Sequence, residues 1–576
     1  MKRMKLNGAA ILIECLIEQE VGTVFGFPGG AVLPIYDELY KRADRIHHVL
    51  TAHEQHAGHA ADGYARASGK TGVCLATSGP GATNLLTPIA TAYMDSSPVV
   101  FITGNVPQTL MGTDSFQEAD ISGMTMPVTK HNYLVTNVEK LADTIREAFY
   151  IAKSGRPGPV LVDIPKDVQL AEAEYVALSG EELIPRLSKK KPLAQLRPEG
   201  EALEQYKLKA EPRLERAAQL IAEAHRPLIY CGGGVTSSGA QEALMALAER
   251  VDAPIVATLM GLGAAPASSD RMLGMLGMHG THAANIAMQR CDLLIAVGVR
   301  FSDRALGDAK AFAPNAKVLH IDIDRAEINK NVSTALHITG DAKIVLELLL
   351  NRVAQKRHAQ WMQQARSMIE DYLSDELFEP RKILKRMAAI APAMTVATDV
   401  GQHQMWTAQH FPFVHPRQLI SSGGLGTMGF GLGAAMGAAQ SDPEGKPVAL
   451  VTGDGSFRMN LTELSTIAYY DIPVIVVIFN NGTLGMVRQW QTLFYEKRYS
   501  ATVLNDAVDF VKLAEAMGAV GMRVTKKEEL TPSLEKALSL GRPVVLDCVI
   551  DCDDKVFPMV AAGKPIDTVF DQDDIQ

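Results

Sequence analysis

The stretch that decides the fold is PVALVTGDGSFRMNLTELSTIAYYDIPVIVVIFNN, residues 447–481. Two apolar runs in it, Val448–Val451 and Val474–Phe479, flank a segment whose apolar residues recur with the period of a helix. Strands without polar residues are typical of parallel sheets, because helices cover both faces of such sheets. The stretch therefore predicts one βαβ unit of a doubly wound α/β domain.

The same alternation of short apolar runs and helical segments continues over the rest of the chain. Its 576 residues exceed the about 250–300 that a single hydrophobic core organises, so we expect three α/β domains, each a doubly wound parallel sheet. These domains are 1–183, 213–350 and 377–549. Besides the two runs above, the clearest strands are Val73–Ala76, Val99–Thr103, Val160–Asp163, Leu228–Cys231, Leu293–Val297, Val318–Ile323 and Val544–Val549.

Three segments fall outside the expected domains. Residues 184–212 are rich in Lys, Pro and Glu and indicate an exposed linker. Residues 351–376 have the pattern of a polar helix and connector. The acidic tail, 550–576, has two interpretations: a disordered end, or a lid over an active site.

Composition excludes several classes of protein. Hydrophobic residues make up 47% of the chain and charged residues 21%, which is typical of a globular protein and excludes a disordered chain. A net charge of -9, with one basic cluster at Lys189–Lys191, argues against nucleic acid as a partner. No run approaches the about 18 uncharged apolar residues of a membrane span. The six cysteines show no zinc-ligand spacing, so we expect reduced thiols and a cytoplasmic protein.

Near the N-terminus, Lys2 and Arg3 precede an apolar segment, Ala9–Ile17, as in a signal peptide. Glu14 interrupts that segment, and Glu18 follows it at helical spacing. We therefore expect an amphipathic helix that stays on the protein.

Two polar residues follow the strands of the stretch quoted first. Asp454 and Asn481 lie just past the carboxyl ends of parallel strands, which is where open α/β sheets bind ligands. One carboxylate and one amide oxygen cannot complete the octahedral shell of Mg²⁺, so water and substrate phosphate oxygens usually fill the remainder. The pair predicts a magnesium site and a ligand that carries phosphate.

The run GDGSF, 453–457, followed by FNN, 479–481, resembles the diphosphate and magnesium motif of thiamine diphosphate enzymes. Within that family, nearly the whole chain is similar to the catalytic large subunits of acetohydroxyacid synthases, also called acetolactate synthases. The segments that carry this resemblance are FPGGAVLPIYDEL (27–39), SGPGATN (78–84), GTDSFQE (112–118), SGRPGPVLVDIPKDV (154–168), MLGMHGTHAAN (275–285), HIDID (320–324), DVGQHQMW (399–406), SGGLGTMGFG (422–431) and LGMVRQWQ (484–491).

The family requires a glutamate that faces N1′ of the cofactor's aminopyrimidine, and Glu54 matches it. In a helix, Glu54 shares a face with Ala57, Gly58 and Ala61. We expect this carboxylate to be buried, with a raised pKa that lets it share a proton with a ring nitrogen. The alternative is a structural glutamate, paired near a helix start.

The resemblance implies further roles around the thiamine diphosphate. Met428 would wedge beneath the bent cofactor, or serve only in helix packing, and Lys166 would lie near the mouth of the substrate channel, or be an ordinary surface lysine. Trp490 would contact the acceptor, or be a buried core residue. Near the reacting carbon we expect Gly29, Gly30 and Gln117, with Phe116 against the substrate pocket; at the diphosphate Val400, Gly401, Gln402, His403, Gly426, Gly455 and Ser456; and on Mg²⁺ the backbone carbonyl of Thr483.

A competing motif lies in the third domain. Gly424, Gly426 and Gly429 spell GxGxxG, the fingerprint of a dinucleotide-binding turn. The preceding strand is short, and the bulky Met428 occupies the turn where a pyrophosphate would need to approach. This match is therefore weak evidence for a redox flavoprotein or an NAD-dependent dehydrogenase.

The middle domain has glycines after a strand and acidic residues after a later strand, a pattern that indicates a dinucleotide site or a tight structural turn. The resemblance implies FAD here, without a redox role. The chain departs from the family at Ser302, where Asp is common, and at Gly433, where Pro is common. The residues expected at FAD are Arg156, Gly232, Gly233, Gly234, His279, Arg300, Arg304, Asp322 and Asp324, with Arg304 also near the substrate.

The implied reaction is decarboxylation of pyruvate and condensation of the remaining two-carbon unit with a second pyruvate or with 2-oxobutanoate. The products, 2-acetolactate and 2-aceto-2-hydroxybutanoate, lead to the branched-chain amino acids. The nearest alternative is a pyruvate oxidase, or another carboligase that holds thiamine diphosphate and FAD. In this family two chains grip one cofactor, so a homodimer would be the smallest active unit; a tetramer and a regulatory small subunit are compatible with the sequence.

Overall fold

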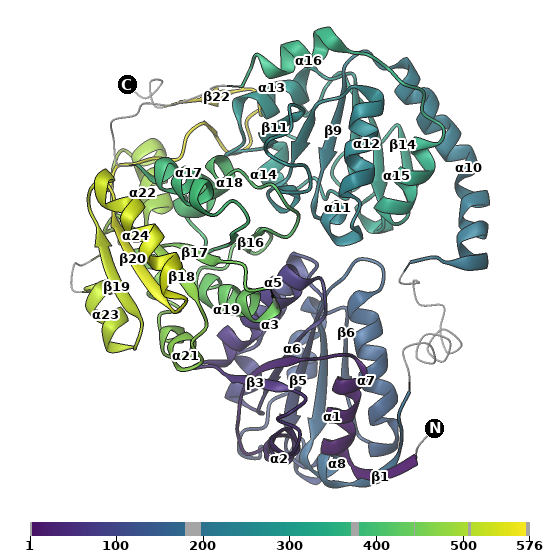
Figure 1. Cartoon of the computed structure of the whole chain (residues 1–576). Helices are drawn as coiled ribbons and strands as arrows, with labels where there is room; N and C mark the ends of the chain where they lie inside the picture. Colours follow the sequence, from purple (N-terminus) through teal and green to yellow (C-terminus); the bar gives the residue numbers. More distant parts are fainter. Residues whose placement is uncertain (1–2, 179–196, 370–378, 443, 505–507, 572–576) are drawn as a thin grey trace.

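The computed structural model describes residues 3–178, 197–369, 379–442, 444–504 and 508–571 (Figure 1). These residues form three six-stranded parallel sheets with helices on both faces. The expected fold class, three doubly wound α/β domains, is therefore confirmed. Every strand named from the sequence is found, within a few residues at its ends.

The first sheet has the strand order β3-β2-β4-β5-β7-β6. Its strands are β2 (Thr23–Phe27), β3 (His47–Leu50), β4 (Gly72–Ala76), β5 (Val99–Asn105), β6 (His131–Leu134) and β7 (Val160–Pro165). Its helices are α1 (Gly8–Glu18), α2 (Leu33–Lys41), α3 (Glu54–Ser68), α4 (Pro80–Thr83), α5 (Leu86–Met94), α6 (Ile121–Thr125), α7 (Val138–Lys153) and α8 (Lys166–Leu170). A separate antiparallel pair joins β1 (Arg3–Asn7) to β8 (Glu172–Val176).

The middle sheet has the order β11-β10-β9-β12-β13-β14. Its strands are β9 (Pro227–Cys231), β10 (Ile255–Ala257), β11 (Met272–Met275), β12 (Leu293–Val297), β13 (Lys317–Asp322) and β14 (Leu336–Thr339). Its helices are α10 (Gly200–Glu223), α11 (Gly233–Ser238), α12 (Gln241–Val251), α13 (His282–Arg290), α14 (Asp303–Leu306), α15 (Ala342–Leu350) and α16 (Ala359–Arg366).

The third sheet has the order β16-β15-β17-β18-β20-β19. Its strands are β15 (Thr395–Thr398), β16 (Leu419–Ser421), β17 (Val448–Gly453), β18 (Val474–Asn480), β19 (Val520–Val524) and β20 (Val544–Val549). Its helices are α17 (Pro380–Ile390), α18 (Gln402–His410), α19 (Gly431–Ser441), α20 (Asp454–Phe457), α21 (Glu463–Tyr469), α22 (Gly485–Phe494), α23 (Phe510–Ala516) and α24 (Lys527–Leu540).

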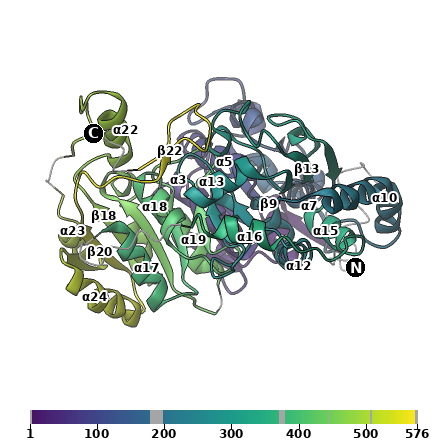
Figure 2. The same ribbon diagram turned by 90° about the horizontal axis from the view of Figure 1, so that it is seen from above.

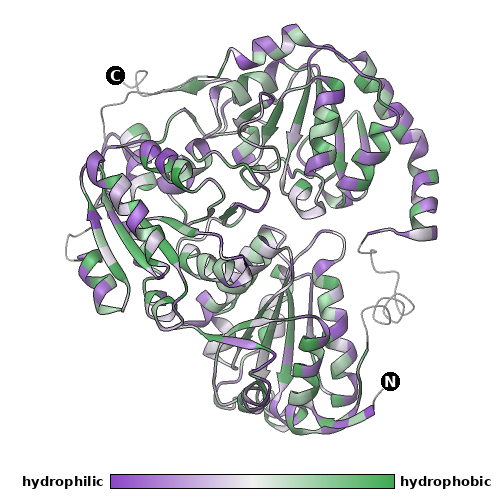
Figure 3. Cartoon of the chain, viewed as in Figure 1, coloured by the Kyte–Doolittle hydropathy of each residue, from purple (hydrophilic) through white to green (hydrophobic). Residues whose placement is uncertain are grey.

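Hydrophobic strands lie at the centre of each domain, and the helices place apolar faces on them and polar faces outward (Figure 3). β5, β7 and β9 are buried along their whole length, as expected for strands covered on both faces. The segment that mimics a signal peptide is helix α1, whose apolar residues join the first core. Within the described ranges, none of the helices has both the length and the apolar character that crossing a membrane requires.

Helices α3 and α19 join the first domain to the third and lie side by side (Figure 1). A Cβ atom on Gly437 would lie 1.9 Å from the carbonyl oxygen of Ala60, and one on Gly63 would lie 2.1 Å from that of Ala434. Only glycine permits this approach of the two backbones. Gly433, the departure from the family, lies on the same interface, where its Cβ would be 2.8 Å from the His56 carbonyl.

The structure corrects the expected linker in part. Residues 200–212 form the first half of α10, with Ala210 buried. Glu, Ala, Leu, Gln and Lys favour helix, so composition alone did not distinguish an exposed helix from a linker. Residues 184–196 of the predicted linker, with Lys189–Lys191, lie outside the described residues, as do residues 370–376 of the connector and 377–378 at the start of the expected third domain.

The tail is ordered as far as residue 571, so the disordered interpretation is wrong for 550–571. Strand β21 (Met559–Val560) pairs with β22 (Val569–Phe570), and Ile566 is fully buried between them. The Val560 N–H donates to the Met278 carbonyl (2.8 Å). The tail thus runs from the third domain onto the middle domain (Figures 1 and 2).

Candidate active site

The predicted metal ligands leave neighbouring strands of the third sheet. Asp454 begins α20 directly after β17, and Asn481 follows β18, which pairs with β17 in parallel. The Asp454 side chain is buried, and its Oδ1 has no hydrogen-bond partner. Burial raises the pKa of Asp454 to about 6, against the opposing effect of Arg458 and nearby backbone N–H groups. A buried carboxylate oxygen without a donor costs free energy, so this atom fits a cation.

Asn481 is held by its neighbours. Its Nδ2 donates to Gln402 Oε1 (3.3 Å), and its Oδ1 accepts from the Thr483 N–H (3.3 Å). The Thr483 hydroxyl instead donates to the Thr502 carbonyl (2.7 Å). The structure therefore brings Asp454, Asn481 and Gln402 together at one sheet edge, while a metal role for the Thr483 carbonyl stays a prediction.

The expected diphosphate residues gather around the start of α18. Val400 and Gly401 link β15 to this helix, which begins with Gln402 and His403. Burial lowers the pKa of His403 to about 3, and its Nε2 has no partner, so a neutral imidazole is left able to bind a ligand. A Cβ on Gly453 would lie 3.0 Å from His403 Nδ1, which explains the glycine before Asp454.

Asp399 is a site residue that the sequence analysis missed. Its buried carboxylate accepts from the Gly431 N–H (2.7 Å), the Thr452 hydroxyl (2.8 Å) and Asn460 Nδ2 (3.1 Å). It thereby ties the end of β15 to α19 and to the Gly453-Asp454 turn. Its position as an acidic residue at a strand end was the available signal.

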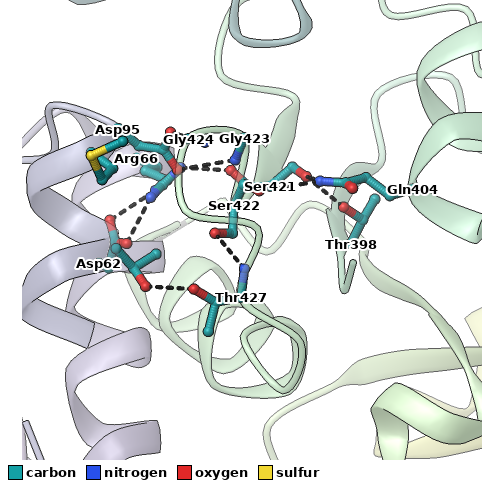
Figure 4. A network of polar contacts seen from close by, with 12 residues as sticks. Asp62, Arg66, Asp95, Thr398, Gln404, Ser421, Ser422, Gly423, Gly424 and Thr427 are labelled. Atoms are coloured by element: carbon teal, nitrogen blue, oxygen red, sulfur yellow. Dashed lines mark hydrogen bonds and ion pairs between the residues drawn. The ribbon is translucent and has the colours of Figure 1, made fainter. Parts of the chain in front are cut away.

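The first glycine of the GxGxxG motif, Gly424, has a hydrogen-bond partner within the chain. The N–H groups of Gly423 and Gly424 donate to Asp95 of the first domain (3.1 and 2.7 Å; Figure 4). Asp95 also pairs with Arg66 of α3 (3.1 Å). Because the Gly424 N–H already has a carboxylate partner, it is not free for a pyrophosphate, which argues against the dinucleotide interpretation of this turn.

Met428 is half-buried between two glycines with left-handed backbone, Gly426 (φ +73°) and Gly429 (φ +82°). The Gly429 N–H donates to the Ser456 hydroxyl (3.2 Å), which connects the Met428 turn to the Asp454-Gly455-Ser456 segment. The expected wedge and diphosphate residues are therefore adjacent. Met428 lies before the first residue of α19, and its role as the wedge stays a prediction.

Glu54 begins α3, and the predicted stripe of Ala57, Gly58 and Ala61 is buried behind it. Glu54 itself is half-buried in the single chain, which is less than the burial expected from the sequence. The reason is its place in the first helical turn, at the open edge of the sheet. Its Oε2 accepts from Asn84 Nδ2 (3.0 Å).

The loop after β4 lies against Glu54, and the loops after β2 and β5 pack against the residues that follow β4. A Cβ on Gly81 would lie 3.2 Å from Glu54 Oε1, one on Gly79 (φ +57°) 2.9 Å from the Gln117 backbone, and one on Gly29 2.5 Å from the Thr77 side chain. Gly30, by contrast, has no atom within 4 Å of such a Cβ. Glu54, Gln117 and Gly29 thus each contact the segment that follows β4, and open space lies beside Gly30.

Phe116 and Lys166 lie further out. Phe116 is 87% exposed, and Lys166 is half-buried at the start of α8, after β7. Among the described residues, no hydrogen bond or ion pair joins Glu54 to Asp454, Asn481 or Gln402. The two halves of the expected site are therefore separate in the contacts of one chain.

Arg156 of the first domain forms ion pairs with two acidic residues of the middle domain. Its Nη1 donates to Asp324 Oδ2 (3.2 Å) and to Glu327 Oε1 (2.8 Å), and Glu327 was not anticipated from the sequence. Arg300 donates to the Met94 carbonyl (2.6 Å), and burial, with nearby Arg156, lowers its pKa. Asp322 is buried and accepts from the Asp324 N–H.

The other residues predicted at FAD differ in how closely neighbouring atoms pack around them. A Cβ on Gly232 would lie 2.2 Å from the Gly298 carbonyl, and one on Gly234 2.6 Å from Gly298 Cα, so a tight turn explains both glycines. Gly233 has more room. His279 is buried with an unpartnered Nδ1, and burial lowers its pKa to about 4. Arg304 is largely exposed and contacts Met278 and Asp303.

Trp490 lies on α22 and is half-buried, with its ring centroid 5.1 Å from that of Phe494. The other two tryptophans, Trp361 and Trp406, are buried in the core. The core interpretation of Trp490 is therefore wrong.

Comparison with known proteins agrees with this geometry. Three family models match in order: the N-terminal TPP binding domain of thiamine pyrophosphate enzymes over 6–124, their central domain over 214–349, and their C-terminal TPP binding domain over 399–548. The fold and site thus define the class of thiamine pyrophosphate enzymes.

Curated relatives narrow that class. The acetolactate synthase large subunit of Corynebacterium glutamicum is 47% identical over 97% of this chain and 89% of its own length. The isozyme 2 large subunit of Escherichia coli acetolactate synthase is 45% identical over 97% of this chain and 98% of its own. A probable acetolactate synthase large subunit of Methanocaldococcus jannaschii is 47% identical, with 97% and 94% covered. The chain belongs to the family of acetolactate synthase large subunits.

Proposed function

We propose that the chain catalyses the synthesis of 2-acetolactate from two molecules of pyruvate, with release of carbon dioxide. With 2-oxobutanoate as acceptor, the product is 2-aceto-2-hydroxybutanoate, and both products serve branched-chain amino acid synthesis. The family and its nearly full-length relatives support this reaction. The observation that carries it is the buried, unpartnered Oδ1 of Asp454 beside Asn481.

The third domain holds the proposed Mg²⁺ and the diphosphate. Asp454 and Asn481 supply oxygen ligands, and the neutral His403 offers its free Nε2 beside them. Gln402 fixes the Asn481 amide, because its Oε1 accepts from Asn481 Nδ2. Thiamine diphosphate, when bound, supplies a thiazolium that accepts the electron pair released by decarboxylation.

The first domain supplies Glu54, the residue proposed to exchange a proton with the aminopyrimidine of the cofactor. Asn84 fixes Oε2 of Glu54, so Oε1 is the oxygen left to hold a proton at the aminopyrimidine. The open space at Gly30 admits the reacting carbon close to the backbone. Gln117, Phe116 and Lys166 would orient the donor pyruvate, while Trp490 and Arg304 would contact the acceptor.

FAD is proposed for the middle domain, in a non-redox role. Several polar atoms near the carboxyl ends of its strands are buried without partners, as a polar ligand requires. They are Thr236 Oγ1, Thr258 Oγ1, His279 Nδ1 and Glu327 Oε2.

We further propose that the chain acts in the cytoplasm as a homodimer or tetramer. Large exposed apolar side chains near both halves of the site, Phe116, Met126, Val487 and Phe494, support contact with a second chain. The large-subunit names of the relatives support a regulatory small subunit as a further partner.

An acetolactate assay tests the proposal, with thiamine diphosphate, Mg²⁺ and FAD omitted in turn. We expect product only when thiamine diphosphate and Mg²⁺ are present, and no consumption of oxygen or quinone. Pyruvate-dependent consumption of an electron acceptor without acetolactate would assign an oxidase instead.

A further inference from the structure

The turn that leads into Glu54 is held by the third domain of the same chain. It runs from Leu50, at the end of β3, to His53, the N-cap of α3. Backbone N–H groups here precede the helix and have no intrahelical acceptors. The Thr51 N–H donates to the Gly26 carbonyl (3.3 Å), within the first domain. The other acceptors come from α21.

Glu463, the first residue of α21, is the main acceptor. Its side chain is fully buried. The Ala52 N–H lies 3.1 Å from both of its oxygens, and the His53 N–H lies 3.2 Å from Oε1. His56 Nδ1 lies 3.0 Å from Oε1, and the Thr466 hydroxyl donates to Oε2 (2.7 Å).

The far end of α21 holds the same turn more weakly. The Leu50 N–H donates to the Tyr470 hydroxyl (3.0 Å), at a solvent-exposed position. Charge-assisted hydrogen bonds are shorter and stronger than neutral ones, so Glu463 dominates this contact. No other described residue of the third domain accepts a hydrogen bond from an N–H of this turn.

We propose that Glu463 is the positioning residue for Glu54: it fixes the first turn of α3 and so sets where the Glu54 carboxylate lies. This inference rests on the proposed function, in which Glu54 exchanges the proton. Glu463 begins α21, the helix that follows α20 with Asp454, so neighbouring helices of the third domain carry the proposed metal ligand and hold the turn before Glu54 of the same chain. A carboxylate displaced by about 1 Å can lose on the order of 100-fold in rate.

Glu463→Gln tests the inference. The amide has the same shape as the carboxylate, but its NH₂ group replaces one of the two oxygens that accept hydrogen bonds from the turn, His56 and Thr466. The full chain is loaded with thiamine diphosphate, Mg²⁺ and FAD, and hydrogen–deuterium exchange at C2 of the cofactor is followed by NMR. We expect exchange to slow by about 10- to 100-fold. The KM for pyruvate should stay within about twofold of the wild-type value, because the substitution removes no contact that binds pyruvate equally in the ground state and the transition state.

Three further variants make the result specific. Glu18→Gln is the matched control, since Glu18, the last residue of α1, also has a buried carboxylate, which accepts from Arg146 and from the Leu178 N–H. It should lower thermal stability and leave exchange unchanged. Tyr470→Phe removes only the weaker acceptor and should slow exchange less than Glu463→Gln. If Glu463→Gln does not fold, Glu463→Asp, with its shorter reach, should slow exchange in the same direction.

Glu54→Gln, measured in parallel, separates the two proposals. Wild-type exchange in Glu54→Gln would overturn the proton role of Glu54 itself. Slow exchange in Glu54→Gln together with unchanged exchange in folded Glu463→Gln or Glu463→Asp would overturn only the positioning role.

Discussion

The two carboxylates of the proposed site are held in opposite ways. Asp454 is buried with one oxygen lacking any donor, whereas Glu54 is half-buried with one oxygen fixed by Asn84. A buried oxygen without donors is suited to a cation that replaces them. A partly open carboxylate with one fixed oxygen is suited to moving a proton at the other. The difference in environment supports the two proposed roles.

Asp454→Ala should weaken Mg²⁺ and thiamine diphosphate together, because the metal bridges the protein and the diphosphate. Loss of an outer partner of a metal ligand already costs about 10- to 100-fold in affinity, so loss of the ligand itself should cost at least that. Isothermal titration of both cofactors measures the effect. FAD should stay bound, since its proposed residues lie in other domains. Normal thiamine diphosphate affinity in this variant would contradict the metal assignment.

At the scale of elements, helix α3 connects Glu54, the proposed proton-transfer group, to the third domain. It contacts α21 at its first turn, α19 along its middle, and the Gly423-Gly424 turn through Arg66 and Asp95 near its end (Figure 4). The contact with α19 depends on glycines, so it should tolerate no added atoms.

Gly437→Ala should therefore force α3 and α19 apart and lower stability by about 1–3 kcal/mol, the usual cost of overpacking. The thermal unfolding midpoint and the acetolactate rate should both fall. Gly22→Ala is the matched control, because a Cβ at Gly22 has no atom within 4 Å. Equal midpoints for the two variants would show that the helices can separate without cost.

Helix α22 carries Trp490 beside the Asn481 strand end, half-buried against Phe494. A broad apolar ring there would favour the ethyl group of 2-oxobutanoate over the methyl of pyruvate, and one methylene is worth about 1–3 kcal/mol. Trp490→Leu should reduce the preference for 2-oxobutanoate and spare pyruvate condensation. Competition of the two acceptors at fixed pyruvate measures this. An unchanged product ratio in an active variant would remove Trp490 from the acceptor pocket.

Sequence patterns predicted the helices and strands better than the contacts between them. The apolar strands and the placement of Asp454 and Asn481 followed from local periodicity and from the rule that parallel strands end at one edge. Glu463, Asp399 and Asp95 were missed because their partners lie far away in sequence, in other elements. The half-burial of Glu54 was missed for a related reason, since helical spacing shows which residues share a face but not what covers it.

At the scale of the whole molecule, the proposed site is divided. Glu54 belongs to the first domain and Asp454, Asn481 and Gln402 to the third, and among the described residues no hydrogen bond or ion pair joins Glu54 to any of these three. Exposed apolar residues flank both halves, including Phe116 and Val487. In a symmetric dimer, a surface on one chain meets its complement on the other, so two sites would form, each from the first domain of one chain and the third domain of its partner.

Mixing two inactive variants tests this division. In a dimer of one Glu54→Gln chain and one Asp454→Ala chain, sites shared between chains would place both substitutions in one site and leave the other intact. Random reassociation of equal amounts should then restore about a quarter of wild-type activity per chain, because half of the dimers are mixed and each has one intact site. Sites built within single chains would each keep one substitution, so the mixture would stay inactive. A mixture of Glu54→Gln with Glu54→Ala is the control and should recover nothing. Absence of recovery in the first mixture, with mixed dimers demonstrated by native mass spectrometry, would contradict the shared site.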